Sequence, residues 1–392
     1  MLLSLAYIFL LAMALGYIFK LLHLPMLLGM LITGVVLGSH FLDVISGSVL
    51  SISAELRQIA LVVILLRAGL ALDIKSLKSV GRSAVMMCFV PASFEIVGML
   101  IVAPLVLGVS YIDAAIMGAV VAAVSPAVVV PKMLNLMEQG IGTQKGIPQM
   151  IMAGGSVDDV FVIVLFTAFL TLGGGGAVEV AHFIQIPVSI VLGLLLGVAS
   201  GWAVTLYFKR FHMRDSLKLI ILVSLSFLFI ATESALKGHV PISGLLAVMA
   251  MGTTIFSRYE TLARRISPKF TKIWVAAEIL LFVLVGAEVD ISYALEAGGA
   301  VVLTLALVML FRMAGVWCSM LGSTLNAKER LFCMIAYLPK ATVQAAIGSI
   351  PLAMGLPCGE MVLMVAVVAI FISAPLGALG IDMTYKRLLS KN

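Results

Sequence analysis

Two adjacent aspartates, Asp158 and Asp159, stand near the start of an apolar run that continues to about Leu172. No lysine or arginine follows them in that run, so no neighbour in the sequence neutralises the pair. An ionised carboxylate in hydrocarbon costs at least about 2.5 kcal/mol, and two adjacent carboxylates also repel each other. The pair therefore indicates a site that meets water, a cation, a proton or a basic partner.

The composition places this site in a membrane protein. Of the 392 residues, 62% are hydrophobic and only 11% are charged, whereas a soluble domain carries roughly 25% charged residues. The apolar blocks have the length of membrane-spanning helices and lack the alternation of a transmembrane β-barrel. We expect an all-α polytopic membrane protein of about 13 transmembrane helices, near residues 3–19, 25–41, 56–72, 84–107, 112–136, 147–172, 184–208, 217–236, 240–257, 273–289, 298–322, 329–354 and 361–381.

The distribution of charge predicts the orientation in the bilayer. Lysine and arginine concentrate in alternate loops, which the positive-inside rule assigns to the cytoplasm. The N-terminus is then outside and the C-terminus inside, and the net charge of +6 needs no nucleic-acid partner. The four cysteines lack metal-ligand spacing, and we expect no cofactor. Connections are short, so residues 1–392 are expected to form one transmembrane unit without a soluble regulatory or nucleotide-binding domain, in a bacterial inner membrane.

The two halves of the chain resemble each other at a nearly constant offset. The matching features are segments 69–74 and 286–291, Pro25 and Pro241, and Pro126 and Pro339. The charge rule puts Asp73 on the inside and its counterpart Asp290 on the outside, so the repeats have inverted topology. Inverted repeats with interrupted helices are typical of secondary transporters, whose site lies near the middle of the membrane.

Prolines interrupt two of the expected spans. Pro126 and Pro131 fall in the fifth span, and Pro339 falls in the twelfth, directly before Lys340. Proline removes a backbone donor and clashes with the preceding turn. The carbonyls that this frees are tolerated in a membrane only where they are buried in protein or line a cavity. We expect the carbonyls before Pro126 and the hydroxyl of Ser125 to supply neutral ligands.

The repeat also pairs two charges of opposite sign. Glu95 and Arg312 differ by the same offset of 217 residues, and each lies deep in an otherwise uncharged span. Helices related by the repeat axis can bring such charges together, so the sequence predicts a buried Glu95–Arg312 ion pair.

The chemistry of the site follows from its carboxylates. Carboxylates bind protons, and hard oxygen ligands also suit small alkali cations. Neighbours on a helix point about 100° apart, so Asp158 and Asp159 cannot both face one cavity. A site that holds a proton or a cation, but not both, exchanges one for the other without covalent chemistry.

Taken together, the stretches 125–131, 155–159 and 339–344 with Arg312 resemble the monovalent cation:proton antiporter superfamily. The similarity is to its paired-aspartate branch, which includes the bacterial NapA and NhaA types and the animal NHA-type sodium/proton antiporters. It implies an NhaA-like fold with two crossed discontinuous helices, a core domain of about 56–172 and 273–381, and dimerisation helices from about 1–55 and 184–257. It also implies a homodimer, alternating access by an elevator-like motion, and exchange of Na⁺ or Li⁺ for H⁺.

The resemblance assigns roles by position. Asp159 corresponds to the main cation- and proton-binding carboxylate, Asp158 to its neighbour, and Glu95 with Arg312 to a stabilising or gating pair. Lys340 corresponds to the charge that offsets the half-helix dipoles. Electrogenic members carry a lysine at the position of Arg312; because arginine keeps its proton, we expect electroneutral exchange.

Other functions explain fewer of these features. A K⁺/H⁺ antiporter and a sodium-coupled symporter of an organic anion remain alternatives, although the symporter would need a larger basic cluster. A channel does not explain the inverted repeat. An intramembrane aspartyl protease needs carboxylates that face each other from separate helices, whereas these two are adjacent on one, so we do not expect an enzyme.

Overall fold

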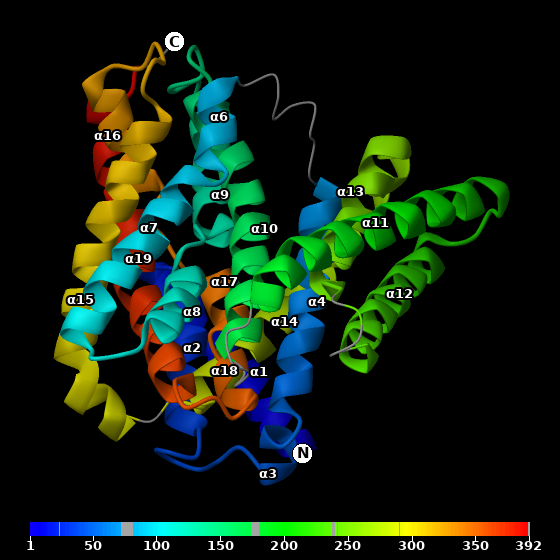
Figure 1. The fold of residues 1–392 in the computed structure, drawn as a ribbon, viewed down its shortest axis with the longest axis horizontal. Coiled ribbons are helices and arrows are strands. Elements are labelled where there is room, and N and C mark those ends of the chain that lie inside the picture. Colours follow the sequence, from blue (N-terminus) through cyan, green and yellow to red (C-terminus); the bar gives the residue numbers. More distant parts are fainter. Residues whose placement is uncertain are drawn as a thin grey trace. The chain divides into compact units, whose positions relative to one another are not determined.

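The computed structural model describes residues 1–22, 24–71, 81–173, 180–236, 240, 242–289 and 291–390, and the regular elements in these ranges are helices (Figure 1). Their bounds are α1 (Leu2–Leu21), α2 (Met26–Leu37), α3 (Gly47–Leu50), α4 (Ser53–Ala71), α6 (Arg82–Met87), α7 (Val90–Val106), α8 (Tyr111–Val121), α9 (Pro126–Glu138), α10 (Ile147–Gly173), α11 (Val180–Arg210), α12 (Asp215–Ala235), α13 (Gly244–Arg258), α14 (Glu260–Ala287), α15 (Ile291–Ser319), α16 (Ala327–Ala336), α17 (Thr342–Ile347), α18 (Ile350–Ala353) and α19 (Gly359–Leu388).

Eight helical segments in the described ranges are long and apolar enough to cross a membrane: Leu2–Leu21, Arg82–Val106, Ile147–Gly173, Val191–Arg210, Asp215–Ala235, Glu260–Ala287, Gly298–Ser319 and Gly359–Leu388. Five shorter apolar helices add to them: Met26–Leu37, Tyr111–Val121, Val128–Met137, Gly244–Arg258 and Thr342–Ala353. The expectation of an all-helical multi-pass membrane protein is therefore confirmed, and the count of about 13 transmembrane helices stays a prediction.

Two of the expected spans are interrupted next to Pro126 and at Pro339, whereas Pro131, also expected to interrupt its span, lies inside α9. The expected span 112–136 consists of α8 and α9, separated by residues 122–125, which we call the first break. The expected span 329–354 consists of α16, α17 and α18, and residues 337–341 between α16 and α17 form the second break. Pro126 is the first residue of α9, where a missing N–H costs nothing. The two breaks touch, because the Ser125 N–H donates to the Pro339 carbonyl at 2.7 Å.

The helices group into two compact units. Unit 1 comprises residues 1–54, 76–162 and 279–392, and unit 2 comprises residues 55–75 and 163–278. This division differs from the core and dimerisation segments expected from the sequence, because residues 1–54 group with the helices that carry the charged residues of interest, and residues 55–75 with the other unit. The functional division into a core and a dimerisation domain stays a prediction.

Close helix packing in unit 1 holds Glu95 and Arg312 opposite each other. Glu95 lies on α7 and Arg312 on α15. A Cβ atom added at Gly98 of α7 would come within 2.6 Å of the Phe311 ring, and one added at Gly315 of α15 would come within 2.8 Å of the Pro91 Cα. Small residues that let backbones approach are the usual device for packing helices in lipid. Here they bring two buried charges into reach.

Unit 2 uses the same device without a comparable set of buried charges among its described residues. Gly193, Gly197 and Gly201 form a stripe along α11 that packs against α13, where Cβ atoms added to them would lie within 2.4–2.8 Å of backbone carbonyl oxygens. Small-residue contacts therefore hold α11 close to α13.

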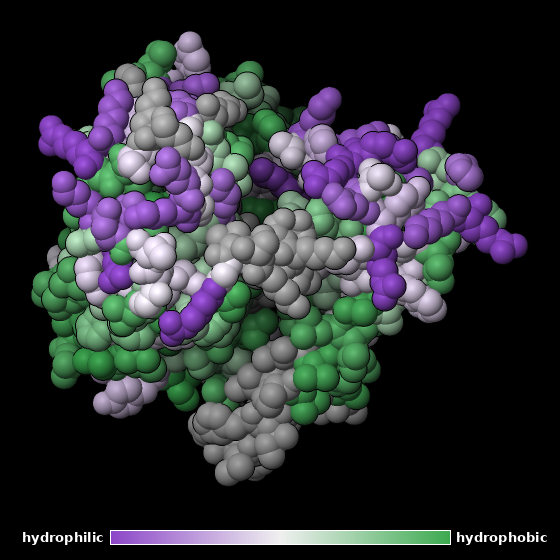
Figure 2. Space-filling view, turned by 90° about the horizontal axis from the view of Figure 1, so that it is seen from above, coloured by the Kyte–Doolittle hydropathy of each residue, from purple (hydrophilic) through white to green (hydrophobic). Residues whose placement is uncertain are grey.

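In unit 1 the two chain termini lie at opposite ends (Figure 1). The C-terminal end carries ion pairs from Lys132 to Asp382 and from Lys145 to Glu329. Figure 2 looks onto this end and shows hydrophilic residues gathered there. Of the repeat partners named above, Asp73, Asp290 and Pro241 lie outside the described residues.

Candidate functional site

Five ionisable side chains meet in the interior of unit 1. They are Glu95 (α7), Asp158 and Asp159 (α10), Arg312 (α15) and Lys340 (second break), which we call the buried charge cluster. Their residues are between 0% and 6% exposed. Buried charges are tolerated when they are paired and hydrogen-bonded, so their contacts decide what the cluster does.

Arg312 is the centre of the cluster. Its Nη1 donates to Glu95 Oε2 at 2.7 Å and also to the Ala122 carbonyl, and its Nη2 donates to Asp158 Oδ2 at 3.0 Å. Its Nε donates to the Tyr337 carbonyl at 2.6 Å. The planar fork of donors in a guanidinium makes such multiple contacts possible. One side chain thus binds two carboxylates and one carbonyl from each break.

Glu95 is shared by two cations. Its Oε2 accepts from Arg312 and, at 2.8 Å, from Lys340 Nζ. The buried Glu95–Arg312 contact that the repeat offset predicted is therefore present, and Lys340 joins it. Lys340 also donates its backbone N–H to Ser373 Oγ of α19 at 3.0 Å. Residues from four separate parts of the chain fix this side of the cluster.

The two aspartates have different environments, as their adjacency on a helix predicts. Asp158 Oδ2 accepts from Arg312 and, at 2.9 Å, from the Val124 N–H in the first break. Oδ1 of Asp158 and Oδ1 of Asp159 are buried and have no hydrogen-bond partner among the described residues. Asp158 is therefore anchored on one oxygen, while Asp159 makes no ion pair to a described basic residue within 4 Å.

Neutral oxygen atoms without partners accompany the aspartates. The hydroxyls of Ser125 in the first break and Thr342 at the start of α17 are buried and unpaired among the described residues. An unpaired buried polar atom costs free energy unless a bound species satisfies it. Carboxylate and neutral oxygens are the donors that hard cations prefer. The donor types present fit a transported alkali cation.

Side chains from other helices satisfy the backbone groups at the first break. The last carbonyls of a helix have no partner within it. Gln344 Nε2 lies 3.2 Å from the Val120 carbonyl, 3.4 Å from that of Val121 and 2.9 Å from that of Ala123, while Arg312 takes the Ala122 carbonyl. The break is therefore held open by specific donors.

Tyr337 joins the second break to the helix of the aspartates. It is fully buried, its hydroxyl donates to the Met87 carbonyl at 3.1 Å, and the Arg312 guanidinium lies 5.2 Å from its ring centre. A Cβ added at Gly154 would lie 2.5 Å from the Tyr337 hydroxyl oxygen. The absence of a side chain at Gly154 therefore leaves room for the Tyr337 hydroxyl.

The structure brings together Glu95, Asp158, Arg312 and Lys340 through direct contacts, and it places Ser125 one residue from the Val124 N–H that Asp158 binds. Sequence reasoning assigned no role to Tyr337, Ser373 or Gln344. Gln344 could have been found as an amide within an apolar half-helix that follows a proline break. Tyr337 and Ser373 carry no such signal, because their partners are backbone atoms that only folding brings close.

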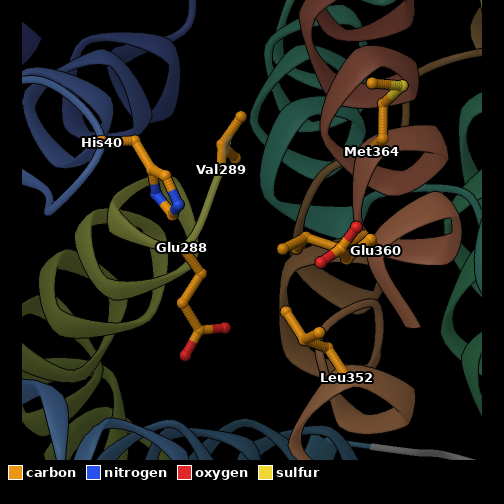
Figure 3. Close-up of a pocket in the computed structure, with 7 residues that line it drawn as sticks. His40, Glu288, Val289, Leu352, Glu360 and Met364 are labelled. Atoms are coloured by element: carbon orange, nitrogen blue, oxygen red, sulfur yellow. The ribbon is translucent and has the colours of Figure 1, made fainter. Parts of the chain in front are cut away.

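A second feature lies at the end of unit 1 opposite the C-terminus. A cavity of about 110 Å³ separates His40, Glu288 and Val289 from Leu352, Glu360 and Met364 (Figure 3). None of the predicted site residues lines it. Among the described residues, no group of three or more His, Cys, Asp or Glu side chains is arranged to hold a metal ion, and this cavity is no exception.

Comparisons with known proteins converge on one family. The model of the family described as "Sodium/hydrogen exchanger, transmembrane" matches residues 8–386. The chain is 36% identical over 384 residues to sodium/hydrogen exchanger 9B2 of Mus musculus, covering 94% of this chain and 69% of that one. It is 31% identical over 387 residues to sodium/hydrogen exchanger 9B1 of Homo sapiens, covering 94% and 73%.

The fold has a solved counterpart. The structure of the sodium proton antiporter MjNhaP1 from Methanocaldococcus jannaschii superposes with a TM-score of 0.84 over 99% of both chains, at 19% identity. This similarity supports an NhaP-like fold for the helical arrangement. The two sodium/hydrogen exchangers, 9B2 and 9B1, are animal proteins, so the expectation of a bacterial inner membrane gains no support from them.

Proposed function

Because the chain belongs to the sodium/hydrogen exchanger family, a family of membrane transporters rather than enzymes, we propose that it exchanges Na⁺ for H⁺ at the buried charge cluster. The observation that carries this assignment is the position of Asp159 beside the anchored Asp158, with buried carboxylate oxygens that lack partners in the described structure. Glu95 Oε1 is also without a partner among the described residues, but Glu95 already pairs with Arg312 and Lys340. Asp159 pairs with neither of them, so it is the carboxylate at which a cation or a proton binds.

The charge of the cluster supports a one-for-one exchange. Glu95, Asp158 and Asp159 contribute three negative charges when ionised, and Arg312 and Lys340 contribute two positive charges. The cluster then has a net charge of −1, which one Na⁺ or one H⁺ neutralises. Burying a net charge in a membrane is expensive, so the cluster favours being occupied by one of the two. Their competition makes exchange electroneutral as long as Arg312 keeps its proton.

Each residue of the buried charge cluster has a separate role in this proposal. Asp159 binds the cation or the proton, and Asp158, anchored to Arg312 and the Val124 N–H, contributes its second oxygen. Ser125 supplies a neutral ligand. Glu95 and Arg312 brace the two breaks, and Lys340 offsets the ends of the half-helices.

Transport itself requires two access states. We propose alternating access by an elevator-like motion, about 13 transmembrane helices and two discontinuous helices that cross at the breaks. The Ser125–Pro339 contact supports the crossing. We also propose a homodimer in the lipid bilayer, with dimerisation helices outside the core, and an orientation with the C-terminal end in the cytoplasm. The basic residues in the ion pairs at that end support the orientation.

The test is an exchange assay in proteoliposomes that contain a pH dye, with an imposed proton gradient and voltage clamped by K⁺ and valinomycin. Na⁺, Li⁺ and choline are added in turn to wild type, Asp159→Asn and the control Asp382→Asn. Asp382 is a half-exposed carboxylate outside the cluster. Na⁺ or Li⁺ should dissipate the gradient in wild type and Asp382→Asn and not in Asp159→Asn.

Two outcomes would change the assignment. If no alkali cation dissipates the gradient at any pH, exchange is wrong, and uptake of organic anions with Na⁺ is measured instead. If K⁺ alone is active, in a separate assay without valinomycin, the cation is K⁺. Repeating the Na⁺ experiment at several clamped voltages tests stoichiometry, because an electroneutral exchanger gives the same rate at each.

A further inference from the structure

The amide of Gln344 is fully buried and lies outside the buried charge cluster. We propose that Gln344 is a positioning residue that holds one peptide of the first break so that its N–H points at Asp158. This inference rests on the proposed function, because it concerns how tightly the cation site binds Na⁺. The residue acts through the backbone and does not touch the ion.

The contacts of the Gln344 amide are to the first break and the end of α8. Nε2 lies 2.9 Å from the Ala123 carbonyl and 3.2 and 3.4 Å from those of Val120 and Val121. An amide nitrogen has two hydrogens, so the three acceptors share them. The short distance makes Ala123 the main acceptor.

The Ala123 carbonyl and the Val124 N–H belong to the same peptide group. Gln344 donates to the oxygen of that group at 2.9 Å, and Asp158 Oδ2 accepts from its nitrogen at 2.9 Å. In a trans peptide the C=O and N–H point in opposite directions. Gln344 and Asp158 therefore hold the peptide from opposite sides, and the orientation of one bond fixes that of the other.

The choice of glutamine suits a break inside a charged site. A lysine or arginine here would satisfy the same carbonyls and would also change the net charge that the cation must neutralise. The amide donates without charge, and its own Oε1 remains without a partner among the described residues. An unpaired buried carbonyl is costly. A leucine would avoid that cost, so the donors of Gln344 are what the site requires.

Removing the donors has a specific consequence. In Gln344→Leu the peptide loses its anchor, and Asp158 loses a well-aligned N–H donor that favours its ionised form. A proton then competes better with Na⁺. The Na⁺ concentration for half-maximal exchange should rise about tenfold at acidic pH, since a hydrogen bond to a charged group is at stake, and should return toward wild type at alkaline pH. The maximal rate should change less.

The test measures half-saturating Na⁺ and maximal rate between about pH 6 and about pH 9, a range that brackets neutrality, in proteoliposomes for wild type, Gln344→Leu, Gln344→Glu and Gln149→Leu. In Gln344→Glu the introduced carboxyl group keeps one donor when it is protonated, so this variant should bind Na⁺ better than Gln344→Leu at acidic pH. Gln149→Leu is the matched control, because the Gln149 amide also has an unpaired buried carbonyl among the described residues. It should match wild type.

Protein integrity is checked by the Na⁺-dependent rise in thermal stability in detergent, with choline as the reference salt. This measures cation binding even in a variant that does not transport. A Gln344→Leu protein with wild-type half-saturating Na⁺ at acidic pH overturns the proposal, as does a fall in maximal rate at every pH without a change in half-saturation. If wild type itself exchanges no Na⁺, the proposed function fails instead, so the two failures are distinguishable.

Discussion

The first and second breaks present the same backbone problem and solve it differently. At the first break, residues 122–125, the freed carbonyls and N–H groups are satisfied mostly by side chains from elsewhere, namely Gln344, Arg312 and Asp158. At the second break, residues 337–341, side chains from elsewhere also satisfy the backbone, because Arg312 donates to the Tyr337 carbonyl and Ser373 accepts from the Lys340 N–H. The difference is that this break adds a cation of its own, Lys340, which binds Glu95.

This difference shows how two similarly interrupted helices come to contribute different chemical groups. Both halves contribute a proline-interrupted helix, and the Ser125–Pro339 hydrogen bond joins them. The half with Lys340 provides positive charge, and the half with the first break provides the N–H that anchors a carboxylate. The two breaks are therefore alike in being interrupted at a proline and different in charge, and the buried charge cluster carries a net charge of −1 when all five of its side chains are ionised. Substitutions of the side chains that bind one break or both breaks test this comparison directly.

Arg312→Leu is expected to have the largest effect, because Arg312 is bound to both breaks and to two carboxylates. Removing one partner of a buried ion pair lowers the free energy of unfolding by about 3–5 kcal/mol. Exchange in proteoliposomes should be lost, and the unfolding temperature in detergent should fall. Arg264→Leu, at an exposed arginine, is the control and should leave both measurements unchanged. A stable, active Arg312→Leu protein would contradict a bridging role.

Lys340→Met should have a smaller effect, confined to the second break. Glu95 loses one of its two cations and keeps Arg312, so the free energy of unfolding should fall by about 1.5–3 kcal/mol. A double-mutant cycle with Glu95→Gln, read as changes in the free energy of unfolding, measures the interaction between Lys340 and Glu95. The loss in Glu95→Gln should be reduced when Lys340 is already methionine, and strictly additive losses would show that the two side chains do not interact.

Ser373→Ala sharpens the comparison further, because it changes only a backbone partner. The Lys340 N–H loses the hydroxyl at 3.0 Å and stays buried without an acceptor, a cost of about 1–3 kcal/mol. The unfolding temperature should fall while half-saturating Na⁺ stays near the wild-type value. A shift in half-saturating Na⁺ with no change in unfolding temperature would mean that Ser373 acts on the ion.

Lys132→Met is expected to have the smallest effect. Lys132 pairs with Asp382, and both side chains are partly exposed at the C-terminal end of unit 1. Exposed ion pairs contribute about 0.2–1 kcal/mol to the free energy of unfolding, and salt screens their attraction. Thermal stability should change little, and less at high salt than at low salt. A loss of exchange in this variant would show that charge outside the breaks takes part in transport.

Several features followed from the sequence without the fold. The apolar blocks and low charge content predicted an all-helical membrane protein, because the blocks have the length of a membrane-spanning helix and lack the alternation of a β-barrel. Pro126 and Pro339 determined where two helices are interrupted. The offset of 217 residues predicted the Glu95–Arg312 contact, because helices related by a repeat can bring opposite charges together, and the contact is present. The adjacency of Asp158 and Asp159 predicted that they differ in environment.

Only the tertiary structure decided how these pieces are connected. Arg312 binds backbone carbonyls at residues 122 and 337, and Gln344 binds the same peptide as Asp158 from the opposite side. These acceptors are main-chain atoms, present at every residue, so the sequence does not distinguish those left free by a break. The grouping of residues 1–54 with the site also depended on close helix contacts, as at Gly34, where an added Cβ would lie 2.0 Å from the Val283 carbonyl oxygen. Which groups become hydrogen-bond partners in the buried interior depends on their distances in the folded chain, and the order of residues in the sequence does not give those distances.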